Sequence, residues 1–385
     1  MSGGTPAWVI VNHDFARDSG QGVANHALAS HLADRGVPLH LVAVRVEPEL
    51  AGRSGVVVHQ VPRARHYPAR ELLLDLIGRR VARRVTSASP GARVVVNGAS
   101  CRWPDVNWVH MVHRAYSPRT VGASLPRRAA MTLSEWRDRW RERWIARCRV
   151  VIANSERTRQ DVVRLLGAPA AHVRTVLLGC DPDAFRPPTD DERRAAREEL
   201  GIPAQARVVL FVGAHGPELR KGLDVLLVAW SQLGREERLR DALLVTAGAG
   251  ALDYWGGRVR ALGLERSIRL LGPTPQVPLL MAAGDVMASP TRYDAYGLNV
   301  REALNAGLPV ITTREVGALE HLPPALVERV TVRDPEDPSE LAARLVACLD
   351  DLPGWRREVA AVGEALRRWT WDAMAAQLVD EVGRS

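Results

Sequence analysis

Residues 286–313 leave few folds open to this chain. The segment starts with a short apolar run, VMAS, and continues through a polar loop that contains glycine, RYDAYGLN. A helix-like stretch, VREALNA, follows and is closed by Gly307, and a β-branched run, VITT, ends the segment. This order of strand, loop, helix, glycine stop and strand is typical of a parallel βαβ unit. In such units ligands bind where the carboxyl ends of strands meet the amino ends of helices.

Two carboxylates mark this segment as a candidate binding site. Asp294 lies in the loop and Glu302 on the helix, with seven residues between them. Gly297 falls between the two, and its missing side chain lets a backbone N–H approach a phosphate closely. The segment therefore combines acceptors for hydroxyl groups with donors for an anion.

The rest of the chain repeats the alternation of strands and helices. In the first half, strands are expected at 8–15, 38–46, 55–61, 93–98 and 106–113, and helices at 23–36, 69–86 and 125–149. Residues 150–169 are expected to form a strand, a turn at Asn154 and Ser155, and a helix. In the second half, residues 206–230 are expected to form a strand, a glycine loop and a helix, with further strands at 243–250 and 268–272 and helices at 255–263, 338–351 and 354–382. This alternation predicts an α/β fold with doubly wound parallel sheets.

The length of 385 residues predicts two domains, each with its own core. Asp-Pro and Pro-Pro steps before a densely charged stretch mark the linker. We expect a first domain over residues 1–187, a second over 188–365, and a final helix over 366–385 that returns to the first.

The composition of the chain indicates which kinds of molecule it can bind. The formal net charge is +8, and 51 of the 52 basic residues are arginine, which leaves Lys221 as the single lysine. A positive balance fits an anionic substrate or a membrane surface, and no nucleic-acid-binding motif is present. There is no apolar run near the ~18 residues that span a bilayer and no signal-peptide pattern. With four scattered cysteines, these features predict a cytoplasmic protein, with peripheral contact at the inner face of the membrane left open.

A basic helix expected over 125–149 carries a tryptophan repeat. Trp136, Trp140 and Trp144 recur every four residues and share one helix face. We weigh two interpretations of this stripe. The favoured one buries it against a sheet, and the other places residues 135–149 on a membrane surface or an acceptor.

Three stretches together resemble family-4 glycosyltransferases of the GT-B fold, over nearly the whole chain. Residues 286–313 are similar to the family's E-x7-E segment with its following helix and strand. The runs VVIANSERTRQDVVRLLGAP and VLLGCDPDAFRP resemble the end of the family's first domain, and LFVGAHGPELRKGLDVLL resembles its phosphate loop. The resemblance implies two Rossmann-like domains facing across a cleft, the first on the acceptor side and the second binding the nucleotide sugar. The chain departs from the pattern at Asp294, in place of Glu, and at Ala214, in place of Arg.

The resemblance also implies roles for the donor-side residues. Glu302 is placed on the ribose hydroxyls and Asp294 on the transferred sugar. Charge that develops on the departing diphosphate needs cations or N–H donors around it, and Lys221 is the best candidate for this task. The remaining donor-side candidates are Arg220, Gly22 at the first helix, and the backbone of Gly297, Leu298 and Asn299.

A histidine completes the expected catalytic set of His113, Asp294 and Lys221. The family carries a histidine at the end of the strand over 106–113, and His113 fits that place better than His110. In a strand the two would point to opposite faces. No metal-binding motif is present, so neither a metal nor another cofactor is expected.

The sequence therefore predicts a retaining, metal-independent glycosyltransferase. The donor would be a nucleotide sugar, with a UDP-linked donor favoured over a GDP-linked one, from which a hexose or hexosamine passes to an acceptor hydroxyl. The acceptor is either a small natural product or aminocyclitol, or a lipid or glycan. The alternatives are a sugar-nucleotide epimerase or phosphorylase of the same fold, and a non-catalytic sugar-nucleotide-binding homologue.

Overall fold

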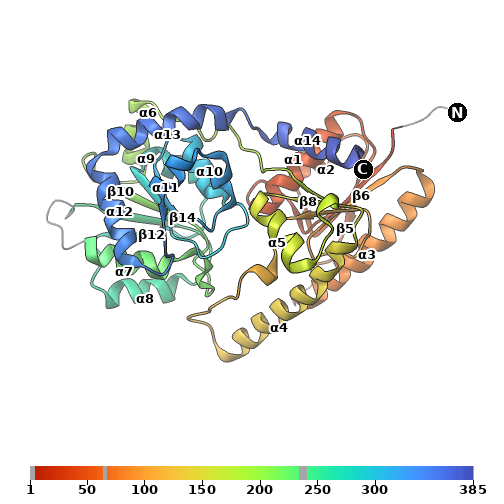
Figure 1. Ribbon diagram of the computed structural model, residues 1–385, viewed down its shortest axis with the longest axis horizontal. Helices are drawn as coiled ribbons and strands as arrows, with labels where there is room; N and C mark the ends of the chain where they lie inside the picture. The colour runs from red at the N-terminus through yellow and green to blue at the C-terminus, as the bar shows by residue number, and fades with distance from the viewer. Residues whose placement is uncertain (1–4, 64–66, 234–240, 385) are drawn as a thin grey trace. The chain divides into compact units, whose positions relative to one another are not determined.

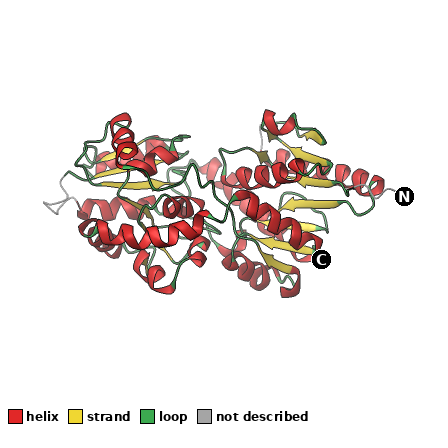
Figure 2. Cartoon of the chain, turned by 90° about the horizontal axis from the view of Figure 1, so that it is seen from above, coloured by secondary structure: helices red, strands yellow, loops and turns green. Residues whose placement is uncertain are grey.

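The computed structural model describes residues 5–63, 67–233 and 241–384 (Figure 1). It divides the chain into two compact units. Unit 1 comprises residues 1–117, 129–179 and 370–385, and unit 2 comprises 118–128 and 180–369. In both units the strands form a parallel sheet with helices on its two sides (Figure 2).

Unit 1 contains a seven-stranded sheet in the order β5-β3-β1-β6-β7-β8-β9 and a two-stranded ribbon, β2-β4. Its strands are β1 (Trp8–Val11), β2 (Asp14–Phe15), β3 (Leu39–Ala43), β4 (Arg45–Val46), β5 (Val56–Gln60), β6 (Arg93–Asn97), β7 (Val106–Val109), β8 (Val150–Ala153) and β9 (Val173–Thr175). Its helices are α1 (Gly20–Asp34), α2 (Pro48–Ala51), α3 (Tyr67–Ala88), η1 (His113–Ala115), α4 (Leu125–Arg141), η2 (Glu142–Arg147), α5 (Glu156–Leu166), η3 (Ala170–His172) and α14 (Trp371–Gly383). The first turn of α4 is grouped with unit 2.

Unit 2 contains a six-stranded sheet in the order β12-β11-β10-β13-β14-β15. Its strands are β10 (Val208–Val212), β11 (Leu243–Ala247), β12 (Ile268–Leu270), β13 (Val286–Ser289), β14 (Val310–Thr313) and β15 (Thr331–Val332). Its helices are α6 (Asp190–Glu199), η4 (Leu219–Lys221), α7 (Leu223–Leu233), α8 (Leu252–Ala261), α9 (Val277–Ala283), α10 (Leu298–Asn305), η6 (Gly317–His321), α11 (Pro324–Val330), α12 (Pro338–Asp350) and α13 (Leu352–Arg367).

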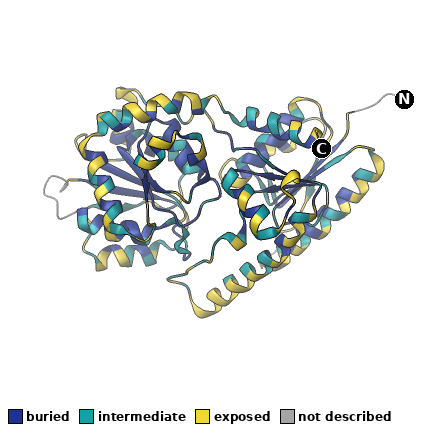
Figure 3. Ribbon diagram, viewed as in Figure 1, coloured by how far each residue is buried: buried dark blue, intermediate teal, exposed yellow. Residues whose placement is uncertain are grey.

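Both sheets follow the Rossmann order, in which the chain reverses direction across the sheet at one pair of neighbouring strands. In unit 1 this switch point lies between β1 and β6, and in unit 2 between β10 and β13. Helices cover both faces of each sheet, so β1, β8, β13 and β14 are buried along their whole length (Figure 3). The doubly wound parallel fold that the sequence predicted is confirmed.

The structure corrects several predicted boundaries. The units change after Gly179 and again before Thr370, and not at 187 and 366. The helix expected over 354–382 is two helices, because Thr370 caps a new one, α14, with its hydroxyl accepting from the Ala373 N–H at 3.2 Å. The long helix expected over 125–149 ends as α-helix at Arg141 and continues as the 3₁₀ helix η2.

Candidate donor site

The candidate site of unit 2 is built where two loops leave the switch point of its sheet. One loop follows β10 and carries Arg220 and Lys221 in η4. The other follows β13 and carries Asp294 and Gly297 before α10. Since the carboxyl ends of neighbouring parallel strands open on the same edge of a sheet, this topology brings the two loops together.

An ion pair joins the loops. The Lys221 ammonium contacts the Asp294 carboxylate, and both side chains are largely buried, at 18% and 13% exposed. Burial alone would raise the pKa of Asp294, but the charges of Lys221 and Arg220 hold it below its ordinary value. Asp294 is therefore ionised at neutral pH. The sequence candidates Lys221 and Asp294 meet, although 73 positions separate them in the chain.

Close backbone contact fixes the loops against each other. Gly222 has a φ of +76°, and a Cβ at this position would lie 1.9 Å from the Pro290 carbonyl oxygen. The Arg220 carbonyl accepts from the Arg292 N–H at 2.8 Å and from the Thr291 hydroxyl at 2.9 Å. The glycine after the lysine is thus required because the second loop presses directly onto it.

Substitution of Gly222 by alanine should consequently damage the whole site. The left-handed backbone and the collision with Pro290 together are expected to lower the free energy of unfolding by more than ~2 kcal/mol. Urea denaturation measures this loss. Gly263 also has a positive φ, +67°, but a Cβ there meets nothing within 4 Å. Gly263→Ala is therefore the control, and an equal loss in both variants would show that backbone strain alone is responsible.

The amino end of α10 faces this junction without a side-chain cap. Gly297 is the N-cap residue with φ +85°, and no side chain there accepts from the first turn. The first backbone N–H groups of a helix have no acceptor within the helix, and the helix dipole adds positive potential. The backbone of Leu298 and Asn299 therefore lies at an uncapped helix end, and its contact with a phosphate stays a prediction.

The Asn299 side chain has a different task from its backbone. Its amide donates to the Val212 carbonyl at 2.8 Å and to the Ser289 hydroxyl at 3.3 Å. It thus ties α10 to the last residues of β10 and β13, at the switch point itself. Sequence reasoning missed this role, which depends on a contact between residues far apart in the chain.

Glu302 lies on the same side of α10 as Asn299, one turn further on. It is half-buried, and burial raises the pKa of its carboxyl from 4.5 to about 8. Within the described residues its carboxylate contacts no hydrogen-bond or ion-pair partner. A shielded carboxyl without a partner is suited to accept hydrogen bonds from a ligand, because the ligand supplies what the protein does not.

Arg220 supports the electrostatics of the site. Its guanidinium lies 3.3 Å from Glu218 and 3.4 Å from the Tyr293 carbonyl, and it is 23% exposed. Its charge contributes to the lowered pKa of Asp294. In the described part of the chain, no cluster of three or more His, Cys, Asp or Glu side chains is arranged to hold a metal ion.

The remaining sequence candidates lie in unit 1. His113 is not in a strand, because β7 ends at Val109, and it begins η1 instead. Its Nδ1 lies 3.2 Å from Glu135. Burial would lower the pKa of His113, but the hydrogen bond to Glu135 and the charge of Glu142 raise it above its ordinary value. His110 is different, because burial lowers its pKa to about 3.

Gly22 lies in the first turn of α1 and not before it. Its N–H donates to the Ser19 hydroxyl at 3.2 Å, and a Cβ would lie 2.6 Å from the Ala16 carbonyl oxygen. The helix cap thus already uses the Gly22 N–H, and a contact of Gly22 with the donor stays a prediction.

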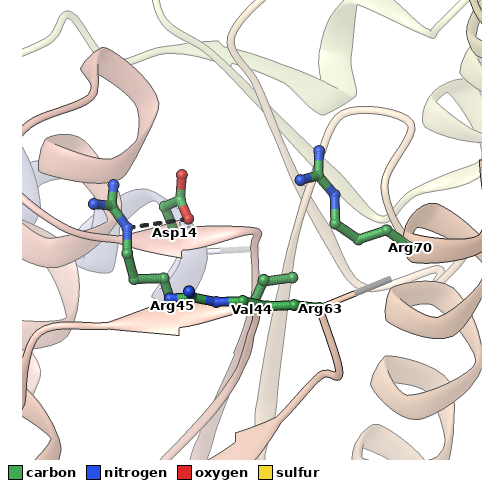
Figure 4. A pocket seen from close by; sticks show the side chains of 5 residues that line it. All are labelled: Asp14, Val44, Arg45, Arg63 and Arg70. Carbon is green, nitrogen blue, oxygen red and sulfur yellow. Dashed lines mark ion pairs between the residues drawn. The ribbon is translucent and has the colours of Figure 1, made fainter. Parts of the chain in front are cut away.

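A pocket of about 250 Å³ opens at the carboxyl ends of the strands in unit 1 (Figure 4). The residues that line it are Asp14, Val44, Arg45, Arg63 and Arg70. The Arg45 guanidinium lies 3.5 Å from Asp14 and binds Asp18 through two hydrogen bonds of 2.5 and 2.6 Å. Sequence reasoning did not single out this pocket, although the positions of Asp14 and Arg45 just beyond β1 and β3 were a usable signal.

Comparison with known proteins identifies the family. Residues 19–184 match Glycosyltransferase Family 4, and residues 206–351 match Glycosyl transferases group 1. A D-inositol 3-phosphate glycosyltransferase of Xylanimonas cellulosilytica is 32% identical over 294 residues, which cover 73% of this chain and 67% of that protein. The chain belongs to glycosyltransferase family 4. It is a glycosyltransferase, as the sequence resemblance implied.

A second curated relative of this family-4 glycosyltransferase agrees with that assignment, and two solved structures match its fold. A D-inositol 3-phosphate glycosyltransferase 2 of Catenulispora acidiphila is 34% identical over 249 residues, or 61% of this chain, and the chain spans 56% of that relative. The solved structure of WaaG, a glycosyltransferase involved in lipopolysaccharide biosynthesis, superposes with a TM-score of 0.77 at 19% identity, covering 96% of this chain and 99% of WaaG. Anabaena Alr3699/HepE, solved in complex with UDP and glucose, gives 0.72 at 17% identity, covering 99% and 100%. The structural matches confirm the GT-B fold.

Proposed function

We propose that the protein is a retaining, metal-independent glycosyltransferase that uses a UDP-linked hexose or hexosamine. The observation that carries this proposal is the junction in unit 2, where Lys221 and Asp294 meet beside the uncapped amino end of α10. Lys221 and the first N–H groups of α10 receive the diphosphate. Arg220 adds a second positive charge to the same region.

Donor recognition divides among the carboxyl groups. Glu302 accepts hydrogen bonds from the two ribose hydroxyls, and Asp294 binds hydroxyls of the sugar. The unpartnered state of the Glu302 carboxyl supports the first role. The second role requires the Asp294 carboxylate to contact both the sugar hydroxyls and the Lys221 ammonium. Lys221 in turn contacts both Asp294 and the diphosphate.

Transfer needs no protein nucleophile in this proposal. The bond from the anomeric carbon to the diphosphate oxygen breaks, and the acceptor hydroxyl forms its new bond on the same face of the sugar. The acceptor proton passes to the leaving diphosphate oxygen. Cations and N–H donors stabilise the charge that develops there, which is the largest contribution expected from the protein.

The acceptor carries a negative charge in this proposal. The pocket of unit 1 presents three arginines and one aspartate, and guanidinium groups bind phosphate well. Relatives named for D-inositol 3-phosphate point to the same chemistry. A phosphorylated cyclitol is thus the first acceptor to test.

A thermal-shift screen against UDP, GDP, ADP and TDP sugars tests the donor, because a ligand that binds only the native state raises the melting midpoint. We expect UDP sugars to give the largest shift, with no change when EDTA is added. Incubation with a phosphorylated cyclitol should then yield a glycoside that keeps the anomeric configuration of the donor, as proton NMR shows.

Other results of the same assays would indicate an epimerase, a phosphorylase or a non-catalytic homologue. Conversion of the donor sugar without any acceptor indicates an epimerase, and dependence on inorganic phosphate indicates a phosphorylase. Saturable donor binding with neither transfer nor hydrolysis indicates a non-catalytic homologue, which the change to Asp294 would explain.

A further inference from the structure

Helix α4 buries charged side chains and exposes apolar ones, and in the η2 turn that continues it Glu142 is buried beside Ile145. The inward side carries Asp138, Arg141 and Glu142, all buried. Arg141 donates to the Ala99 carbonyl at 2.7 Å and to the Ser100 carbonyl at 3.0 Å. The charged side of this amphipathic segment thus anchors it to unit 1, the reverse of the usual arrangement.

The outward side carries what we term the tryptophan face: Leu133, Trp136, Trp140 and Trp144. Their exposed fractions are 62%, 65%, 43% and 39%. Five of the ten exposed large apolar side chains in the described residues lie between Leu125 and Trp144. The favoured sequence interpretation, a stripe buried against a sheet, is therefore wrong. Contiguous exposed apolar surface of this kind marks an interaction site.

The exposed charged side chains beside the tryptophan face are positive. Arg143 and Arg147 are exposed and stand over the Trp140 and Trp144 rings, at 4.9 and 4.4 Å from the ring centres. The carboxylates of this segment point elsewhere. Glu135 contacts His113 and Arg139, Asp138 contacts Arg137, and Glu142 accepts from backbone N–H groups. The outward surface therefore offers aromatic rings and positive charge and no exposed carboxylate.

We propose that the tryptophan face, with Arg143 and Arg147, docks on an anionic lipid bilayer. Indole rings prefer the headgroup level of a membrane, where one edge is apolar and the other wet. Arginine beside them binds lipid phosphate and is attracted by the negative surface potential. Such a surface binds peripherally, and among the described residues no helix has both the length and the apolar character needed to cross a bilayer. Docking is independent of the donor and acceptor proposed above.

Sedimentation with lipid vesicles tests this proposal. The full chain should pellet with vesicles that contain 30% phosphatidylglycerol and stay in solution with pure phosphatidylcholine. Salt near 0.5 M should weaken binding, because it screens the arginine contribution. Trp136→Ala/Trp140→Ala/Trp144→Ala is expected to lower the partition coefficient more than ~10-fold, and Arg143→Glu/Arg147→Glu by a similar factor.

Matched controls separate docking from general effects. Val228→Ala/Leu271→Ala removes exposed apolar groups elsewhere, at 38% and 43% exposure, and Arg368→Glu/Arg384→Glu makes the same change of charge at exposed positions. Both should bind like the parent. Unchanged melting midpoints show that the tryptophan variants fold. Equal vesicle binding by the parent and the tryptophan variants overturns the proposal. The proposal also fails if the parent does not bind vesicles and instead forms a concentration-dependent dimer that the tryptophan substitutions abolish.

Discussion

Lys221→Met is expected to lower kcat by about 100-fold or more, with little change in the structure. The ammonium stabilises charge that develops on the diphosphate as it departs, and losing one such group typically costs two to three orders of magnitude. A radiolabelled transfer assay measures the loss. Methionine keeps the length of the side chain, so packing around η4 changes little.

The structure adds a complication, because Lys221 also neutralises Asp294. Its removal leaves a largely buried carboxylate without its partner, which should lower the free energy of unfolding by roughly 2–4 kcal/mol. Lys221→Met/Asp294→Asn removes both charges and should regain most of this stability. It should remain inactive, since neither group then serves the donor.

The pair of variants therefore distinguishes catalysis from stability. Near-parental turnover in Lys221→Met would falsify the assignment of Lys221 to the diphosphate. If turnover instead returns in the double variant together with stability, then Lys221 acts only by holding Asp294.

The alternation of strands and helices could be predicted because it depends on local pattern. Strands such as VVIA and WVIV are apolar along their whole length, which indicates burial on both faces. The βαβ segment over 286–313 was predicted in its element order, as β13, α10 and β14, although α10 begins at Leu298, two residues before the predicted helix. The placement of residues 118–128 with unit 2 could not be predicted, since it depends on distant backbone contacts, such as the Val121 N–H with the Pro217 carbonyl at 2.7 Å.

The tryptophan stripe shows why pattern alone misleads. Residues 125–149 have the spacing of an amphipathic helix, and such spacing usually means a buried apolar face. Spacing shows which side chains share a face but not which face meets the protein. Here the inward face is fixed by hydrogen bonds of Arg141 and Glu142 to backbone groups, which no property of the isolated helix reveals.

At the donor site, residue types were predictable and their interactions were not. Lys221, Asp294 and Glu302 were chosen for charge and resemblance, and the structure brings the first two into contact. The contact between Lys221 and Asp294 depends on how the loops after β10 and β13 pack together at Gly222. The contrast between Asp294 and Glu302 is likewise tertiary, because a neighbouring cation holds one carboxyl ionised while burial without a partner favours the protonated form of the other.

Glu302→Gln is expected to weaken UDP binding about 10- to 100-fold while stabilising the protein at alkaline pH. Glutamine keeps one acceptor oxygen, so one of the two hydrogen bonds from ribose hydroxyls is lost, and a bond to a charged acceptor is worth roughly 1.5–3 kcal/mol. Isothermal titration calorimetry measures Kd. Glu364→Gln, at an exposed carboxyl on α13 that pairs with Arg368, is the control and should bind UDP like the parent.

The gain in stability follows from the direction of the pKa shift. The folded-state pKa of Glu302, about 8, lies above the ordinary value of 4.5, so the folded protein holds this proton more tightly than the unfolded chain does. Stability is full below pH 4.5, falls as pH rises toward 8, and is then constant. Glutamine carries no charge to bury. The variant should therefore exceed the parent by on the order of 5 kcal/mol at pH 9 and match it at pH 4.5, as urea denaturation at the two pH values shows.

The same shift links a proton to donor binding. Ribose hydroxyls that donate to Glu302 favour its ionised form, so UDP should expel a proton from the parent near pH 7.5. Calorimetry in two buffers of different ionisation enthalpy counts that proton, and Glu302→Gln should release none. Proton release that persists in the variant would assign the effect to another group, and unchanged affinity with no proton released from the parent would remove Glu302 from the ribose.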